Sequence, residues 1–162
     1  MRNPLMIVAA LLSIFTFSAC KHTQKTTNSQ AGNEGLTAVM SVPQSVKAGV
    51  PVTLKFTVSN NSAKDLKFCK WHTPFEGFLN SYFDIKDGNG TDARYKGAMA
   101  KRVMPPPAES YITVKAGKSI SAEVDLLKAY DLSTPGTYKV IYQGGSMSGI
   151  EKVNEVNVTI TK

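Results

Sequence analysis

Apolar and polar residues alternate along most of the chain beyond Leu36. Residues 51–61, PVTLKFTVSNN, place an apolar side chain at every second position from Val52 to Val58. Residues 136–142 (GTYKVIY) and 156–161 (VNVTIT) repeat the pattern. Successive side chains of a β-strand point to opposite faces, so this alternation predicts strands with one buried face. No window longer than about ten residues has a strong helical period, which indicates an all-β chain.

Turn residues separate the alternating segments at short intervals. The segments DGNG and PG, for example, accept the backbone conformations of tight turns. About seven to nine short strands then predict an immunoglobulin-like antiparallel β-sandwich with two sheets. Tyr138 stands where that fold often places a tyrosine whose hydroxyl bonds back to the backbone. The tetrapeptide VKAG occurs at 46–49 and at 114–117, and it predicts the same turn at two hairpins.

The first residues have the features of an export signal. One positive charge precedes an apolar run over residues 5–17, which is too short for a transmembrane span and typical of a signal peptide. The run ends in FSAC, which resembles the lipobox of bacterial lipoproteins, whose Cys is lipidated and becomes the new N-terminus. We therefore expect a signal peptide at 1–19, a lipidated Cys20 heading a disordered tether over 20–35, and one β-sandwich domain over 36–162. An ordinary signal peptide that ends near a Cys is the alternative.

The chain is basic, with 19 Lys and Arg against 12 Asp and Glu and a formal net charge of +7. The Lys residues are scattered and do not form the stripe with interleaved aromatic residues that a nucleic-acid surface needs, so we expect no nucleic-acid partner. Positive charge favours anionic lipid or an acidic partner protein instead. The lipid anchor predicts a membrane-anchored protein of the bacterial cell envelope. No acidic run of the kind that resembles a surface-export signal follows Cys20, so we expect the protein to face the periplasm.

Candidate catalytic and metal-binding residues are scarce. The sequence has two His, His22 and His72, and two Cys, Cys20 and Cys69. A hydrolytic zinc site takes three protein ligands, often from a His-Glu-x-x-His helix, and the sequence has no such motif. Cys69 and His72 would point to opposite faces of a strand, so they do not make a catalytic dyad. We expect a non-catalytic protein with no metal and no cofactor, in which Cys69 is a buried thiol rather than a reactive one.

The densest cluster of aromatic and polar residues is KWHTPFEGF at 70–78. In the structural interpretation, Trp71 packs between the sheets and Thr73-Pro74 turns the chain. Glu76 then accepts hydrogen bonds from backbone N–H groups of the loop, because buried backbone groups need partners. This interpretation does not exclude binding, so the corner from Trp71 to Gly77 is also a candidate contact for a partner.

A second candidate contact is the segment YKGAMAKRVMPPPAESY at 95–111. Tyr95 should end one strand and Tyr111 should begin another, with a long connection between them. Three consecutive prolines stiffen this connection, and stiffness lowers the entropy lost on binding. The loop is expected to present Lys101 and Arg102 to a partner. A solvent-exposed loop whose charges keep a sheet edge soluble is the alternative.

The order of several segments resembles a known family. SVPQSVKAGVPVTLKFTVSNNS, LKFCKWHTPFEGF, YFDIKDGNG, ARYKGAMAKRVMPPPAESYITVKAG and SAEVDLLKAYDLSTPGTYKVIY together look like the prosegment of bacterial deuterolysin-type (aspzincin) metalloendopeptidases, including precursors of the peptidyl-Lys kind. The resemblance runs from about residue 36 to 142, with Cys69 and His72 as departures from the family pattern. Those precursors also contain a catalytic domain with His-Glu-x-x-His and Gly-Thr-x-x-Asp motifs, which this sequence lacks.

The resemblance implies a role as folding helper or inhibitor of a secreted or periplasmic metalloendopeptidase, with Lys101 as the residue for a specificity pocket and Arg102 beside it. The leading hypothesis is therefore a lipid-anchored, non-catalytic partner of such a peptidase. The alternatives are a generic immunoglobulin-like envelope module that binds another protein or a glycan, and an enzyme of a type that the sequence does not reveal.

Overall fold

The computed structural model describes residues 35–162, and these residues are almost entirely β-structure. Cys20, the predicted signal peptide and the predicted tether up to residue 34 lie outside the described residues. The strands are β1 (Leu36–Ser41), β2 (Ser45–Lys47), β3 (Thr53–Asn60), β4 (Leu66–Cys69), β5 (Phe83–Asp87), β6 (Tyr111–Val114), β7 (Ser119–Asp125), β8 (Gly136–Tyr142) and β9 (Val156–Thr161). The helical turns are η1 (Pro74–Glu76), η2 (Ala108–Ser110), η3 (Leu126–Lys128) and α1 (Gly145–Ser148).

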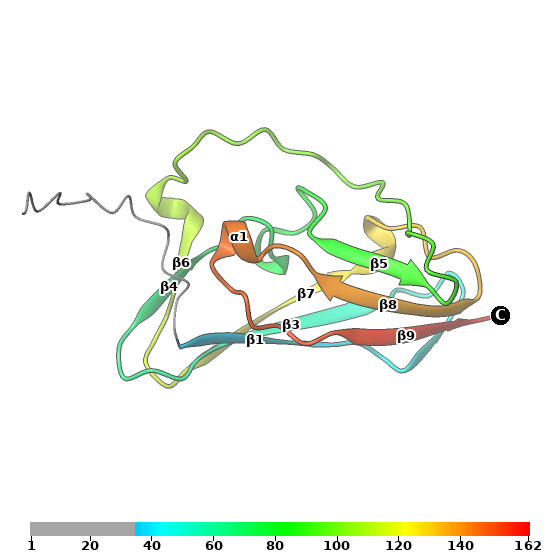
Figure 1. The fold of residues 1–162 in the computed structure, drawn as a ribbon, viewed down its shortest axis with the longest axis horizontal. Coiled ribbons are helices and arrows are strands. Elements are labelled where there is room, and N and C mark those ends of the chain that lie inside the picture. Colours follow the sequence, from blue (N-terminus) through cyan, green and yellow to red (C-terminus); the bar gives the residue numbers. More distant parts are fainter. Residues whose placement is uncertain (1–34) are drawn as a thin grey trace, which may run out of the picture.

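The strands form two larger sheets and one small ribbon (Figure 1). One sheet has the order β1-β3-β7 and the other has the order β2-β9-β8-β5, while β4 and β6 pair with each other. Phe56 of β3 and Tyr142 of β8 bring their ring centroids within 5.1 Å, so the two larger sheets pack face to face. The predicted two-sheet β-sandwich is confirmed.

The alternation in the sequence explains the core. In β3 the side chains of Leu54, Phe56 and Val58 are fully buried, while the alternating residues Thr53 and Lys55 are exposed. Burial of such side chains stabilises the fold by about 1.5–3 kcal/mol each. The predicted tyrosine corner is also present, because Tyr138 at the start of β8 donates its hydroxyl to the carbonyl oxygen of Thr134 at 2.8 Å.

Two details differ from the sequence-based expectation. The pairing is not wholly antiparallel, because β2 runs parallel to β9. The two VKAG segments do form similar turns, with Gly49 and Gly117 at φ +82° and +64°. Neither turn closes a hairpin, however: β2 pairs with β9 and β3 with β1 and β7, whereas β6 pairs with β4. The turn residues determine where the chain reverses, but they do not determine which strand the next strand pairs with.

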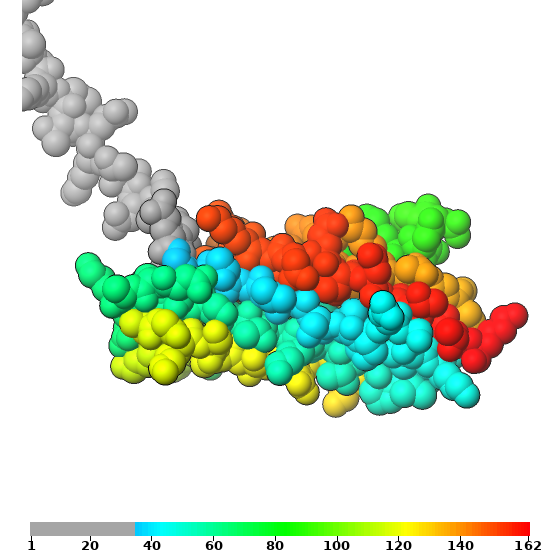
Figure 2. Space-filling model, turned by 90° about the horizontal axis from the view of Figure 1, so that it is seen from below, coloured from blue at the N-terminus to red at the C-terminus, as the bar shows by residue number. Residues whose placement is uncertain are grey.

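One side of the sandwich is closed by contacts between β1 and the segment that precedes β9. Figure 2 shows β1 and the segment before β9 side by side on the surface. The side chain of Asn154 accepts from the backbone N–H of Met40 at 2.7 Å and donates to its carbonyl oxygen at 3.0 Å. The opposite side ends in β7 and β5, the outer strands of the two sheets. No helix within residues 35–162 is long and apolar enough to span a membrane.

Candidate functional site

The corner that follows β4 is built by short-range hydrogen bonds. The Thr73 hydroxyl donates to the carbonyl oxygen of Lys70 at 2.6 Å and accepts from the N–H of Phe75 at 3.2 Å. Thr73 thereby caps η1, which begins at Pro74 because a proline at the first helical position loses no hydrogen bond. The N–H of Lys70 donates to the carbonyl oxygen of Ser110 at 2.8 Å, which ties the corner to the far end of the 95–111 segment.

Backbone geometry makes this corner intolerant of substitution at two glycines. Gly77 ends η1 at φ +73° and ψ −159°, a conformation that is open to glycine. Gly144, before α1, packs against the corner so closely that a Cβ atom there would overlap with the carbonyl oxygen of His72. His72 itself has φ +58°, and within residues 35–162 no other non-glycine residue has a positive φ. The corner is therefore a rigid feature held from two sides.

Arg102 reaches from the long loop into this corner. Its Nη2 donates to Glu76 Oε2 at 2.7 Å, and its guanidinium carbon lies 4.6 Å from the centre of the Trp71 ring. The other Glu76 oxygen accepts from the backbone N–H of His72 at 2.8 Å. The side chain of Glu76 is 4% exposed and that of Arg102 is 18% exposed, so the ion pair is largely desolvated. We call Trp71, Glu76 and Arg102 the clasp.

The clasp confirms part of the sequence interpretation and corrects another part. Trp71 is buried, as predicted, but it lies beneath Arg102 at the corner and outside the core cluster between the sheets. Glu76 accepts from a backbone N–H of the loop, as predicted. Arg102 was expected to face a partner beside Lys101; in the structure it turns into the corner instead, and its contact with a partner stays a prediction. Its guanidinium group forms an ion pair with Glu76 and lies over the Trp71 ring. Of the two basic residues, Lys101 is therefore the exposed one.

The long loop is fixed at several points along its length. The N–H of Lys96 donates to the carbonyl oxygen of Ala129 at 2.7 Å, and that of Ala100 donates to Leu79 at 2.8 Å. Tyr95 was expected to end a strand, but it forms only an isolated bridge with Tyr130. Its hydroxyl donates to the carbonyl oxygen of Ala98 at 2.8 Å. Tyr111 begins β6, as predicted. The loop arches over the corner (Figure 1).

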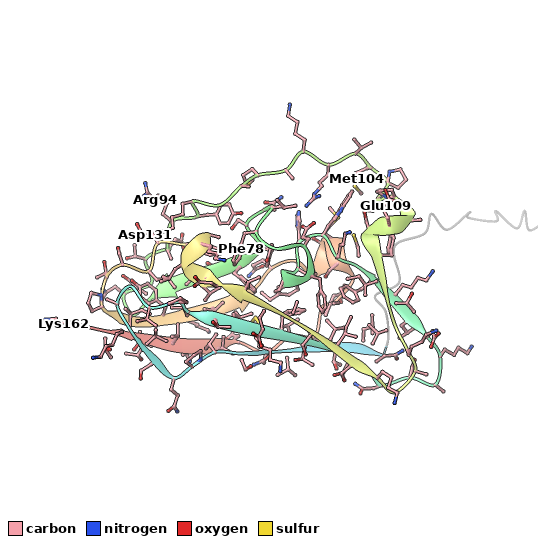
Figure 3. All side chains as sticks on the ribbon, turned by 180° about the vertical axis from the view of Figure 1, so that it is seen from behind. Phe78, Arg94, Met104, Glu109, Asp131 and Lys162 are labelled. Atoms are coloured by element: carbon pink, nitrogen blue, oxygen red, sulfur yellow. The ribbon has the colours of Figure 1, made fainter. Side chains whose placement is uncertain are left out.

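Residues 99–104 carry apolar side chains that sequence analysis did not single out. Met99 is 67% exposed, Val103 84% and Met104 60%, and Lys101 lies among them. Figure 3 shows Met104 on the long loop, close to Glu109. Large apolar side chains that gather on a surface mark interaction sites. The sequence AMAKRVM contains all three apolar residues, but it does not show that their side chains are exposed. The structure shows this, because Arg102 points into the corner and its neighbours point to solvent. We call residues 99–104 the arch tip.

Burial sets the ionisation of the titratable groups beside the clasp. Burial raises the pKa of the Cys69 thiol above its usual range, so this side chain stays a buried, neutral thiol as predicted. Burial also lowers the pKa of His72, and Asn80 Nδ2 lies 3.0 Å from its Nε2. An amide NH₂ can only donate, so the neutral ring accepts at Nε2. Within residues 35–162, no group of three His, Cys, Asp or Glu side chains is placed to hold a metal ion.

The comparison with protein families identifies the class of domain. Residues 39–159 match the family model of the immunoglobulin-like domain, and the chain belongs to this family. The fold that the alternating pattern predicted is therefore the fold of the family.

Three curated proteins are similar to this chain. The "Extracellular protease" of Aeromonas hydrophila is 30% identical over 91 residues, which are 56% of this chain and 25% of that protein. The "Neutral protease 2 homolog" of Uncinocarpus reesii is 31% identical over 97 residues, 56% of this chain and 26% of that protein. An "Uncharacterized secreted protein" of Arthroderma benhamiae is 29% identical over 92 residues, 55% of this chain and 47% of that protein. The chain thus matches a quarter to about half of the length of these relatives.

Proposed function

We propose that this protein is a lipid-anchored, non-catalytic member of the bacterial cell envelope that binds an aspzincin-type metalloendopeptidase as folding helper or inhibitor. The observation that carries the proposal is the similarity to about a quarter of two proteins named as proteases. Residues 39–159 of this chain belong to the immunoglobulin-like domain family. The resemblance of the chain to aspzincin prosegments supports a role in which the domain contacts the peptidase.

The arch tip is the contact surface in this proposal. A segment that is already held in its bound shape loses less conformational entropy on binding. The clasp holds Arg102, and the backbone bond from Ala100 to Leu79 holds the other side of Lys101. Lys101 can therefore extend into an acidic specificity pocket while Met99 and Val103 pack against its apolar rim. Trp71, Thr73, Pro74, Glu76 and Gly77 position the loop from below and do not themselves face the peptidase.

Replacing Lys101 by Ala should weaken complex formation without destabilising the domain. Lys101 is exposed and forms no ion pair within residues 35–162, so its removal leaves the fold unchanged. A buried basic side chain at a specificity pocket is worth about 2–4 kcal/mol, and we expect Kd to rise about 30-fold or more. The measurement is inhibition, or the yield of assisted refolding, of a purified aspzincin metalloendopeptidase by the full chain.

Lys118→Ala is the matched control, because Lys118 is exposed in a turn of a different segment. It should bind like the wild type. If Lys101→Ala also binds like the wild type, the contact lies elsewhere on the domain. If the wild type neither inhibits nor assists the peptidase and forms no complex with it, the proposed function is wrong.

Replacing Cys20 by Ser should release the protein from the membrane fraction. A lipidated Cys holds a protein at the membrane because each buried CH₂ group of the acyl chains contributes about 0.8 kcal/mol. The measurement is fractionation of cells, with mass spectrometry of the N-terminal peptide of the wild type to detect the acyl groups. A wild-type protein that is unmodified at Cys20 and recovered in the soluble fraction would contradict the anchor.

A further inference from the structure

Residues 99–103 of the arch tip are an extended segment that pairs with no strand of the described chain. Side-chain exposure alternates along them, because Lys101 and its second neighbours Met99 and Val103 are exposed, whereas Ala100 and Arg102 are partly buried. This period of two is the pattern of extended backbone, in which successive side chains point to opposite sides. The segment belongs to none of the sheets within residues 35–162, and it crosses above the domain within the loop of Figure 1.

The backbone of Lys101 is free as well as its side chain. The N–H of Ala100 donates to the carbonyl oxygen of Leu79 at 2.8 Å. In extended backbone the N–H and C=O groups of the next residue point to the opposite edge, so those of Lys101 point away from Leu79. Within residues 35–162 they make no hydrogen bond. Lys96 on the same loop is exposed too, but its N–H donates to the carbonyl oxygen of Ala129, which holds that backbone against the domain.

An extended segment with a free carbonyl group and a basic side chain has the shape of an endopeptidase substrate. Peptides bind in extended form when their backbone pairs with a strand of the partner. An endopeptidase then places one side chain in a specificity pocket, and an acidic pocket takes Lys or Arg. Because the carbonyl group of Lys101 is the free one, the bond between Lys101 and Arg102 is the bond that this geometry offers for hydrolysis.

Both sides of that bond are held by contacts that a cut leaves intact. On the N-terminal side, the backbone N–H of Ala100 bonds to Leu79. On the C-terminal side, the Arg102 guanidinium donates to Glu76 at 2.7 Å and lies 4.6 Å from the centre of the Trp71 ring. Neither contact uses the carbonyl carbon of Lys101 or the backbone nitrogen of Arg102, so the new chain ends stay close to each other.

The strand order also keeps a cut domain in one piece. Cleavage after residue 101 separates β1–β5 from β6–β9 in the sequence. Four pairings join these two groups, because β2 pairs with β9, β3 with β7, β4 with β6, and β5 with β8. The core side chains of the two groups also belong to one cluster. The two fragments therefore remain folded together without the covalent bond.

Building on the proposed function, we propose that the arch tip is the reactive site of a substrate-like inhibitor, whose Lys101–Arg102 bond is hydrolysed by the peptidase that it inhibits. Water supplies a hydroxyl group to the carbonyl carbon of Lys101 and a hydrogen atom to the nitrogen of Arg102 as the C–N bond breaks. At neutral pH the new carboxyl group gives its proton to the new amine. The cut domain leaves the active site slowly, because its two new ends are held in the shape in which they bound.

The test is incubation of the full chain in detergent with an equal concentration of a purified aspzincin metalloendopeptidase. Peptidase activity is followed with a small peptide substrate, and the fragments of the chain are identified by mass spectrometry. We expect inhibition and one cut within residues 35–162, between Lys101 and Arg102. The two fragments should elute together in native size-exclusion chromatography and separate in denaturant. Lys101→Ala, at an exposed residue, should abolish the cut.

The outcomes separate this inference from the proposed function. Inhibition without a cut, a cut at another bond of residues 35–162, or fragments that separate without denaturant overturns the reactive site and leaves the proposed function standing. A complex without inhibition overturns the reactive site in the same way. If the peptidase is neither inhibited nor bound, the proposed function is wrong and the reactive site falls with it.

A matched pair of variants tests whether the clasp retains the cut ends. Glu76→Gln keeps the shape of the side chain and removes the charge that holds Arg102. We expect the inhibited peptidase to recover its activity at least about tenfold faster with this variant, the factor that corresponds to about 1.4 kcal/mol. Glu109→Gln, at an exposed acid of the same loop without an ion pair in the described chain, should behave like the wild type. Equal recovery with the two variants overturns retention by the clasp.

Discussion

The protein with Trp71 replaced by Ala should lose about 3–5 kcal/mol of its free energy of unfolding, a large part of the stability of a domain of this size. Trp71 is 6% exposed, so truncation leaves a cavity beneath the arch. It also removes the ring on which the Arg102 guanidinium lies, at 4.6 Å. The measurement is denaturant unfolding followed by circular dichroism, because the variant has no tryptophan to report by fluorescence.

The aromatic variant Trp71→Phe separates these two causes. Phenylalanine fills most of the volume and still presents a ring to Arg102, so we expect it to lose less than half as much stability as Trp71→Ala. Leu79→Ala is the surface control, since Leu79 is 38% exposed. An unchanged unfolding curve for Trp71→Ala would show that the side chain acts as a surface anchor for a partner, contrary to its burial.

The sequence predicts the parts of this fold that depend on local pattern. Alternation identified the buried face of β3, because burial follows directly from the direction of successive side chains. The tyrosine corner was predictable because Tyr138 and its acceptor Thr134 are four residues apart. The burial of Cys69 followed from its apolar neighbours. In each case the contact is made within a strand or across one turn.

Contacts between distant segments escaped the sequence-based interpretation. Arg102 and Glu76 are 26 residues apart, and the polarity of AKRVM favours exposure of both basic residues. Arg102 points inward because the loop crosses the corner there, and this path is not visible in the local sequence. The pairing of β6 escaped prediction for the same reason. β6 pairs with β4 although β7 follows it in the sequence, and nothing local to either strand sets that choice.

Replacing Glu76 by Ala should cost about 3 kcal/mol of unfolding free energy, at the low end for a broken buried ion pair because Arg102 keeps some exposure to water. The change removes the acceptor of Arg102 and also that of the His72 N–H. Glu76→Gln keeps the shape and one acceptor oxygen but no charge, so it should cost clearly less. Chemical denaturation of both variants at neutral pH gives the comparison.

The coupling between the partners decides how the clasp acts on the loop. If Glu76 stabilises the fold mainly by neutralising Arg102, then Glu76→Ala combined with Arg102→Ala should be less destabilising than the sum of the single changes. Amide exchange at residues 99–104 should then rise in each single variant and equally in the double variant, because either change releases the arch tip. Additive losses of stability with unchanged exchange at 99–104 would contradict the clasp. In that case the arch would be held by its backbone bonds at Lys96 and Ala100, and Arg102 would only cover Trp71.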